Sequence, residues 1–180
     1  MTILIQVFLP AYALTSCASG AFGDIQSAGE YQVKAAFLYN FANFVQWPAA
    51  AFTNPSDPIV IGVVGDDPFG ETLDQTVKNK TINGRKLVVK HFAKVSNIGR
   101  CHVLFVSSSE KRSLRSIFRE LQGSSVLTVS DMDGFADSGG TIGFIKECGK
   151  VRFEINTKAA KKSNLTISSK LLRLAKIVGD

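Results

Sequence analysis

The chain has 180 residues, of which 45% are hydrophobic and 20% charged, and this ordinary globular composition argues against a disordered protein. After position 23 it contains no uncharged apolar run of about 18 residues, which argues against a membrane span in that part. Two histidines and three cysteines leave little material for a zinc site.

The formal net charge of +6 is unevenly distributed along the chain. From Thr157 onward six basic residues accompany one acid, so this stretch carries +5 and the remainder is close to neutral in sum. A solvated helix face is the favoured interpretation, with contact to a membrane surface or an acidic partner as the alternative. We expect no nucleic-acid partner.

The first element in chain order is a predicted leader. Residues 3–16 are mostly apolar and small residues follow them, which indicates a secretory signal peptide over 1–23 and a folded domain over 24–180. No Lys or Arg precedes the apolar run, which is a departure from the usual pattern. The residues from Leu14 to Cys17 also fit a lipobox, so lipidation of Cys17 stays open as an alternative to simple cleavage.

A helix is predicted over residues 30–46, because apolar side chains recur every four residues from Val33 to Val45. Pro48 ends it, since proline disfavours helical geometry in the residue before it. Such an apolar stripe is typical of a helix that packs on a sheet.

Short apolar runs, separated by helices, follow this first helix. Helices are predicted over 69–77 and, from a capping box at Ser107, to about 121. This alternation predicts one α/β domain with a mainly parallel, doubly wound sheet flanked by helices. The expected strands are 59–64, 86–92, 103–106 and 126–129.

The end of the chain differs from this pattern. Residues 142–146 and 151–155 alternate apolar and polar side chains around a turn at Cys148-Gly149, which predicts an antiparallel C-terminal hairpin. A last helix is predicted over 168–178. We expect it to bury Leu171, Leu172, Leu174, Ala175 and Val178.

Two cysteines remain after the leader. Cys101 opens a predicted strand and Cys148 lies in the hairpin turn. A pair in an exported protein suggests a disulfide, but nothing in the sequence brings the two together. Two free thiols are the favoured interpretation, and the disulfide stays open.

Polar side chains follow the predicted strands. Asp66 and Asp67 follow the first, Ser107 follows the third, and Asp131 follows the fourth, at the sheet edge where ligands of such folds bind. Acids and hydroxyls there could hold a small ligand or Mg²⁺. Because the same residue types are common in turns and caps, turn chemistry is favoured, and no metal or cofactor is predicted.

Nothing in the sequence supports catalysis. His91 and His102 lie within or at the start of strands, and the chain has no G-x-S-x-G, P-loop or G-x-G-x-x-G motif. We therefore expect a protein that is not an enzyme.

Four segments stand out as a set. They are EYQVKAAFLYNFANFVQWP at 30–48, GRCHVLFVS at 99–107, VLTVSDMDGFADSGGTIGF at 126–144 and KVRFEINTKAAKKSNLTISSKLLRLAKIV at 150–178. Together they resemble the YfiR family of exported bacterial proteins. The resemblance implies a compact α/β regulator of the periplasm, tending to dimerise, that restrains a membrane-bound diguanylate cyclase and is opposed by an outer-membrane lipoprotein.

The resemblance also implies partner-binding residues, which are Ile142, Phe153 and Glu154. The alternation places Glu154 opposite the inward-facing Phe153, so we expect it to be at least partly exposed. The alternative function is a small-ligand-binding or sensing module of the periplasm, which would use the strand-end acids and Trp47.

Overall fold

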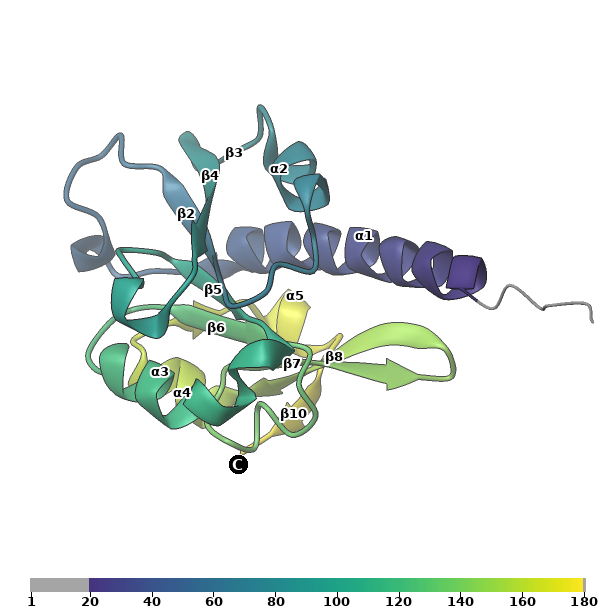
Figure 1. Ribbon diagram of the computed structural model, residues 1–180. Helices are drawn as coiled ribbons and strands as arrows, with labels where there is room; N and C mark the ends of the chain where they lie inside the picture. Colours follow the sequence, from purple (N-terminus) through teal and green to yellow (C-terminus); the bar gives the residue numbers. More distant parts are fainter. Residues whose placement is uncertain (1–19, 180) are drawn as a thin grey trace, which may run out of the picture.

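The computed structural model describes residues 20–179, with side chains from residue 29 onward, and forms an eight-stranded sheet flanked by helices (Figure 1). The strands lie in the order β10-β8-β7-β6-β5-β2-β4-β3, and those from β4 to β7 are parallel. Along the chain these five run second, first, third, fourth, fifth, which is a doubly wound order. The predicted fold class is confirmed. The bounds are β2 Ile59–Val64, β3 Thr81–Ile82, β4 Arg85–Phe92, β5 Val103–Val106, β6 Leu127–Ser130, β7 Ile142–Glu147, β8 Lys150–Asn156 and β10 Lys176–Val178.

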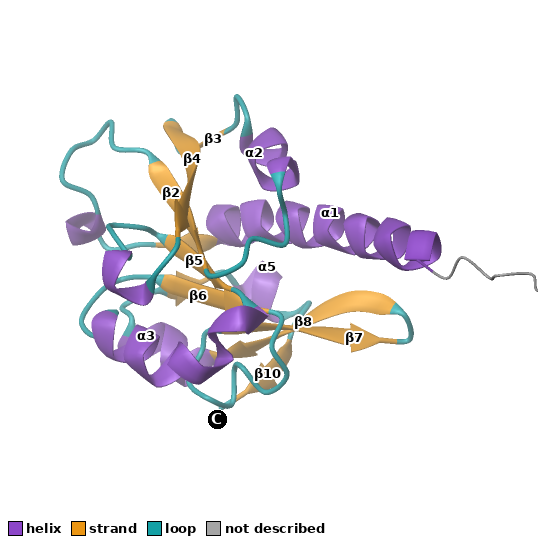
Figure 2. Cartoon of the chain, viewed as in Figure 1, coloured by secondary structure: helices purple, strands orange, loops and turns teal. Residues whose placement is uncertain are grey.

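Helices cover both faces of the sheet (Figure 2). Helix α1 (Gly20–Phe44), with α2 (Glu71–Val77), packs on one face over the larger core cluster. Helix α3 (Leu114–Glu120), preceded by a 3-10 turn at Ser108–Ser113, packs on the other face over a second cluster. Every residue of β2 and β5 is therefore buried, which explains why these strands are unbroken apolar runs.

Helix α1 begins at Gly20, ten residues before the start predicted at Glu30, and it ends at Phe44. Val45–Gln46 forms strand β1, which pairs with β9 (Thr166–Ile167) instead of continuing the helix. Proline at position 48 restricts the preceding residue, so the chain is already extended where the stripe ends. The predicted leader and Cys17 lie outside the described residues.

The predicted C-terminal hairpin is confirmed. Strands β7 and β8 are antiparallel, and the loop between them has positive φ at both Cys148 (49°) and Gly149 (73°). Two such residues make a type I′ turn, whose twist matches that of the strands. Cys101 and Cys148 are both free thiols. Cys148 is exposed, whereas burial raises the pKa of Cys101 to about 12.

The predicted last helix over 168–178 is wrong. Only Ser169–Leu172 (α5) is helical, and Lys176–Val178 forms β10, parallel to β8. A short helix α4 (Thr157–Lys162) and β9 also precede it, and neither was predicted. Leu174, expected in the core, is 69% exposed. The open backbone edge of β8 offers the last residues a strand partner, which outweighs their helical spacing.

The basic residues of this end do not share one helix face. They are exposed on α4, α5 and β10 and in the turn between α5 and β10. The expected solvation is therefore observed, but over several short elements.

Candidate functional site

The predicted strand-end site lies between the parallel strands β2 and β5, where the order of strand addition along the sheet reverses. The turn after β2 is closed there by the serines that follow β5. The amide of Asp66 donates to Ser109 Oγ at 3.0 Å, and Ser109 Oγ lies 3.3 Å from Ser107 Oγ. A Cβ on Gly65 would lie 2.5 Å from Ser109 Oγ, so the space beside this turn is filled by protein atoms.

The carboxylates at these strand ends serve local structure. Asp67 Oδ1 accepts the amide hydrogen of Phe69 at 2.9 Å, as an aspartate in a turn does, and its Oδ2 lies 3.5 Å from His91 Nδ1. Within residues 29–179 no three His, Cys, Asp or Glu side chains are grouped to hold a metal ion. Asp67 and Ser107 thus bond within the turns, and Asp66 takes part through its backbone amide, with its side chain exposed.

Asp131 takes part in an ion-pair network with α1, which we call the Lys34 network (Glu30, Tyr31, Lys34, Asp131 and Lys146). Lys34 Nζ lies 2.7 Å from both Glu30 Oε1 and Asp131 Oδ2. Tyr31 donates to Asp131 Oδ2 at 2.8 Å, and Lys146 Nζ lies 2.7 Å from Glu30 Oε2. The network joins α1, the end of β6 and the β7–β8 hairpin.

Burial makes this network matter energetically, because the Lys34 side chain is only 5% exposed. An unpaired charge at this depth would cost several kcal/mol, and the carboxylates of Glu30 and Asp131 compensate the Lys34 ammonium. Burial opposes ionisation of Glu30, but hydrogen bonds from Lys146 and Lys34 outweigh it and lower the pKa of Glu30. Burial and the hydrogen bond to Asp131 raise the pKa of Tyr31 well above its ordinary value.

Four phenylalanines form a second link between α1 and the hairpin. We call Phe37, Phe41, Phe144 and Phe153 the Phe cluster. The rings of Phe41 and Phe153 are 5.0 Å apart between centroids, and those of Phe37 and Phe153 5.4 Å. Edge-on ring contacts at such distances add to the stability from area burial. The hairpin is thus fixed against α1.

The structure places the three predicted partner-binding residues inside the protein. Ile142, Phe153 and Glu154 are all buried, and Phe153 belongs to the Phe cluster. The expectation that Glu154 is exposed is wrong, because only 5% of it is accessible. The reason is that the β6–β7 loop covers the reverse face of the hairpin, so both faces of β8 are buried from Phe153 onward.

Glu154 occupies space left by a glycine. Gly143 is its cross-strand partner, and a Cβ on Gly143 would lie 3.1 Å from Glu154 Oε1. Burial and the nearby Asp137 raise the pKa of Glu154, and Lys176, with Nζ at 3.9 Å from Oε2, opposes that shift. The alternating sequence pattern did not predict the burial of Glu154, because it shows which residues share a face of the hairpin but not which other segment covers that face.

A groove lies between α1 and the hairpin, and we call it the α1–hairpin groove. Strand β7 pairs with β6 only at Ile142 and Gly143, whereas the hairpin continues beyond them. The groove holds about 520 Å³ and has an apolar floor. Its lining residues are Gly29, Glu30, Val33, Phe37, Lys146, Gly149, Lys150 and Val151.

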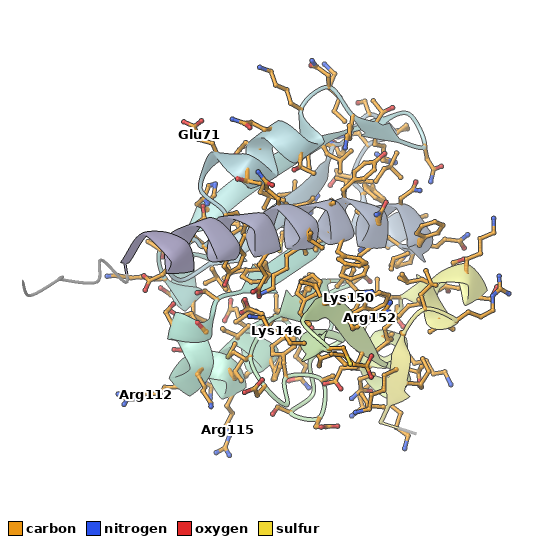
Figure 3. The ribbon with its side chains drawn as sticks, turned by 90° about the vertical axis from the view of Figure 1, so that its right-hand side faces the viewer. Glu71, Arg112, Arg115, Lys146, Lys150 and Arg152 are labelled. Carbon is orange, nitrogen blue, oxygen red and sulfur yellow. The ribbon has the colours of Figure 1, made fainter. Side chains whose placement is uncertain are left out.

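Val33 and the basic residues of the hairpin give the groove its chemistry. Val33, expected in the buried stripe, is 45% exposed, although the next residues of α1, Lys34 and Ala35, are buried. Figure 3 shows Lys146, Lys150 and Arg152 on the hairpin beside α1. All three are exposed, and Lys146 and Lys150 line the groove, so its apolar residues are bordered by positive charge.

Trp47 lies away from the strand-end acids. Its Nε1 donates to the carbonyl of His102 at 3.2 Å, at the amino end of β5. His102 itself is buried, and its Nδ1 accepts the amide hydrogen of Val60 at 3.0 Å. Burial lowers the pKa of His102, which agrees with a neutral structural role. The tryptophan and acids of the ligand-site alternative are therefore at opposite ends of the strands.

These features belong to a recognisable family. The family model described as YfiR/HmsC-like matches residues 31–176, which is most of the chain and runs from within α1, through the hairpin, to the first residue of β10. The chain belongs to the YfiR/HmsC-like family. Proteins of this family are periplasmic regulators of cyclic-di-GMP signalling, and the resemblance found in the sequence is confirmed. No curated protein matches the chain in sequence.

Solved structures similar to this YfiR/HmsC-like chain support the fold. A conserved domain protein from Vibrio cholerae O1 biovar El Tor aligns with a TM-score of 0.55 at 13% identity, over 82% of this chain and 59% of that one. The ABC domain in complex with L-Trp from Streptococcus pneumonia aligns with a TM-score of 0.54 at 10% identity, over 83% and 60%. The chain thus spans about three fifths of each, and at these identities the likeness shows the fold alone. Among the described residues, no helix is long and apolar enough to cross a membrane.

Proposed function

We propose that this protein is a periplasmic inhibitor of a membrane-bound diguanylate cyclase, acting on the periplasmic region of that enzyme. Membership of the YfiR/HmsC-like family over residues 31–176 is the observation that carries the proposal. An outer-membrane lipoprotein that competes for the inhibitor, and a homodimer, belong to the same proposal. So do export by the leader and, as its variant, a lipid anchor at Cys17.

The α1–hairpin groove is the contact surface that the geometry favours. It combines an apolar floor with exposed basic residues, the usual anatomy of an interface core and rim. The Phe cluster and the Lys34 network hold its two walls in a fixed relation, so binding orders little additional chain. We therefore move the proposed contact from the buried Ile142, Phe153 and Glu154 to exposed residues of the same hairpin and of α1.

The groove also predicts what the cyclase presents to it. A segment that places an apolar side chain against Val33 and Val151, flanked by carboxylates near Lys146 and Lys150, would match it in shape and charge. Lys146 is already paired with Glu30, and Arg152 lies 4.0 Å from Glu147, so Lys150 is the stronger electrostatic contributor.

The test uses a gene deletion in the bacterium of origin. Deleting the gene should raise cellular cyclic-di-GMP, and the wild-type gene should restore the lower concentration. Val33→Asp with Lys150→Glu should fail to restore it while the melting temperature of the purified variant stays unchanged, since both side chains are exposed. Lys158→Glu with Lys161→Glu, on exposed positions of α4, is the control with a comparable loss of positive charge.

Two results would contradict the proposal at different levels. Unchanged cyclic-di-GMP in the deletion strain would contradict the inhibitory function. Full repression by the folded groove variant would leave the function standing and remove the groove as its contact surface.

A further inference from the structure

Strand β4 has an outer edge that is only partly paired with another strand. On its inner side β4 pairs with β2 from Leu87 to Phe92. On its outer side the two-residue strand β3 pairs only with Arg85 and Lys86, and the amide of Leu87 donates to the carbonyl of Lys80 at 3.4 Å. Beyond Leu87, no strand among residues 20–179 pairs with this outer side.

The alternation of a strand identifies which backbone groups remain open. In a strand, the amide and carbonyl of one residue point to the same side, and the next residue points to the other. The amide of Leu87 bonds to Lys80 on the outer side of β4, and the carbonyl of Phe92 accepts from Gly65 on the inner side. The residues after Leu87 whose backbone groups point to the outer side are therefore Val89 and His91. Their two amides and two carbonyls therefore point away from β2, along about 7 Å of edge that no described strand pairs with.

The sequence around this edge is strongly basic, although the net charge summed over residues 1–156 is close to zero. Between Asp74 and Glu110 the chain carries five lysines, two arginines and no acid, so this stretch has a charge of 7 − 0 = +7. Lys78, Lys80, Lys86 and Lys90 are exposed at or beside the edge. None of these four forms an ion pair with a carboxylate of the described residues.

A hollow of about 650 Å³ lies along the same edge. Its walls are the end of α2, the turn into β3 and the start of β4. Val77, Leu87, Val88 and Val89 give the apolar lining, Lys78, Lys80 and Lys86 the basic lining, and Asp74 is the acidic residue among them. The hollow therefore offers space for side chains next to the open backbone groups.

We propose that the free edge of β4 binds an extended acidic segment of a partner protein by strand addition. The backbone of that segment would bond to Val89 and His91, its carboxylates would face the four lysines, and an apolar side chain would enter the hollow. Strand addition gives affinity through main-chain hydrogen bonds and specificity through alternate side chains.

Other occupants fit the edge less well. The outward carbonyls of Val89 and His91 need N–H donors, which the phosphates of a lipid surface or a nucleic acid lack. A second copy of this chain would bring the same lysines against themselves. Lysines on an edge can also serve only to prevent such pairing, and the experiment distinguishes that role.

The β4 edge and the hairpin of the α1–hairpin groove lie toward opposite ends of the strand order, so the proposal does not depend on the cyclase contact. The probe is an acetylated, amidated peptide of three Glu-Val repeats, titrated into the protein while amide signals are followed by NMR. The control peptide has the same sequence with every amide N-methylated, which keeps its charge and removes its donors. We expect the amides of Val89 and His91 to shift and to gain protection from hydrogen exchange with the first peptide alone.

Two variants separate charge from backbone pairing. Lys86→Glu with Lys90→Glu should weaken binding by about tenfold or more, whereas Lys161→Glu with Lys162→Glu on α4 should change it by less than about twofold. Val89→Pro removes one outward donor without removing an inward bond, so a folded variant should also bind at least about tenfold more weakly.

The proposal is overturned if the N-methylated peptide binds as tightly as the first, because the attraction is then electrostatic only. It is equally overturned if the Val89 and His91 amides stay unprotected in the wild-type protein, a result that does not depend on any variant folding. Binding of anionic vesicles or single-stranded DNA more tightly than the peptide, with the same loss in the Lys86→Glu, Lys90→Glu variant, would assign the edge to that other ligand.

Discussion

The β7–β8 hairpin and the outer edge of β4 are two places where the sheet reaches solvent, and they are built in different ways. The hairpin is held to α1 by the Phe cluster and by the buried Lys34 network. The β4 edge has half-buried valines, exposed lysines and two residues whose backbone groups face solvent.

The comparison relates burial to the kind of contact that each region can make. A hairpin fixed by packing presents a surface of constant shape, which suits side-chain recognition in a groove. An open strand edge offers backbone groups instead, and these need no particular sequence to pair. The first region should therefore be sensitive to core substitutions and the second nearly insensitive to them.

The largest effect is expected from emptying the Phe cluster. Phe41→Ala should lower the free energy of unfolding by about 3–5 kcal/mol, because Phe41 is fully buried between α1 and the hairpin. Urea denaturation measures this. Val88→Ala at the half-buried β4 edge should cost only about 1 kcal/mol, and an equal cost at both positions would break the comparison.

Removing the central charge of the Lys34 network should have the next largest effect. Lys34→Met should cost about 3 kcal/mol, because it leaves the partly buried Asp131 and Glu30 without their shared cation. Adding Asp131→Asn should recover part of the loss, as a double-mutant cycle would show. At the other edge, Lys90→Met should change the stability by less than about 0.5 kcal/mol.

Acid should weaken the same network through Glu30. Its pKa is lowered in the folded protein, so its contribution is present above the ordinary pKa and is lost as the pH falls through the folded value. Glu30→Gln should lower stability by about 1 kcal/mol at neutral pH and flatten the loss measured between about pH 7 and pH 3. If the variant keeps the wild-type slope, Glu30 is not the titrating group.

Glu154, on the reverse face of the hairpin, should show the smallest effect and the opposite sign. Its raised pKa means that the folded state favours the protonated form, so stability falls as the pH rises through the range between the unfolded and folded pKa values. Glu154→Gln should therefore increase the free energy of unfolding at neutral pH by less than about 1 kcal/mol. A slightly higher melting temperature would show this. Glu147→Gln, exposed near the hairpin tip, is the matched control and should have no effect.

Where the local pattern and the tertiary structure agree, the predictions were confirmed. The strands over 59–64 and 103–106 have the predicted bounds, because strands buried on both faces must be apolar throughout. The turn at Cys148-Gly149 is also where it was expected. Turn chemistry acts over a few residues, so the sequence contains the information needed.

The errors came from contacts between distant segments. Leu174 has the spacing of a buried helical residue but lies exposed, since the following residues join β8 as a strand. Glu154 has the spacing of an exposed strand residue but is buried, since the β6–β7 loop lies over it. Counting charge over a whole segment also concealed the basic stretch between Asp74 and Glu110, because acids elsewhere in the chain cancel it.

The α/β class, the central strands, the hairpin and, through four resembling segments, the family could all be predicted from the amino-acid sequence. Those features depend on local spacing and on turn residues, which are properties of neighbouring positions. Which side chains reach solvent depends on tertiary packing. That packing buries Glu154, exposes Val33 on α1, and leaves the outer side of β4 without a strand partner beyond Leu87 among the described residues. Exposure depends on what packs across from a residue, and spacing along the chain does not specify that.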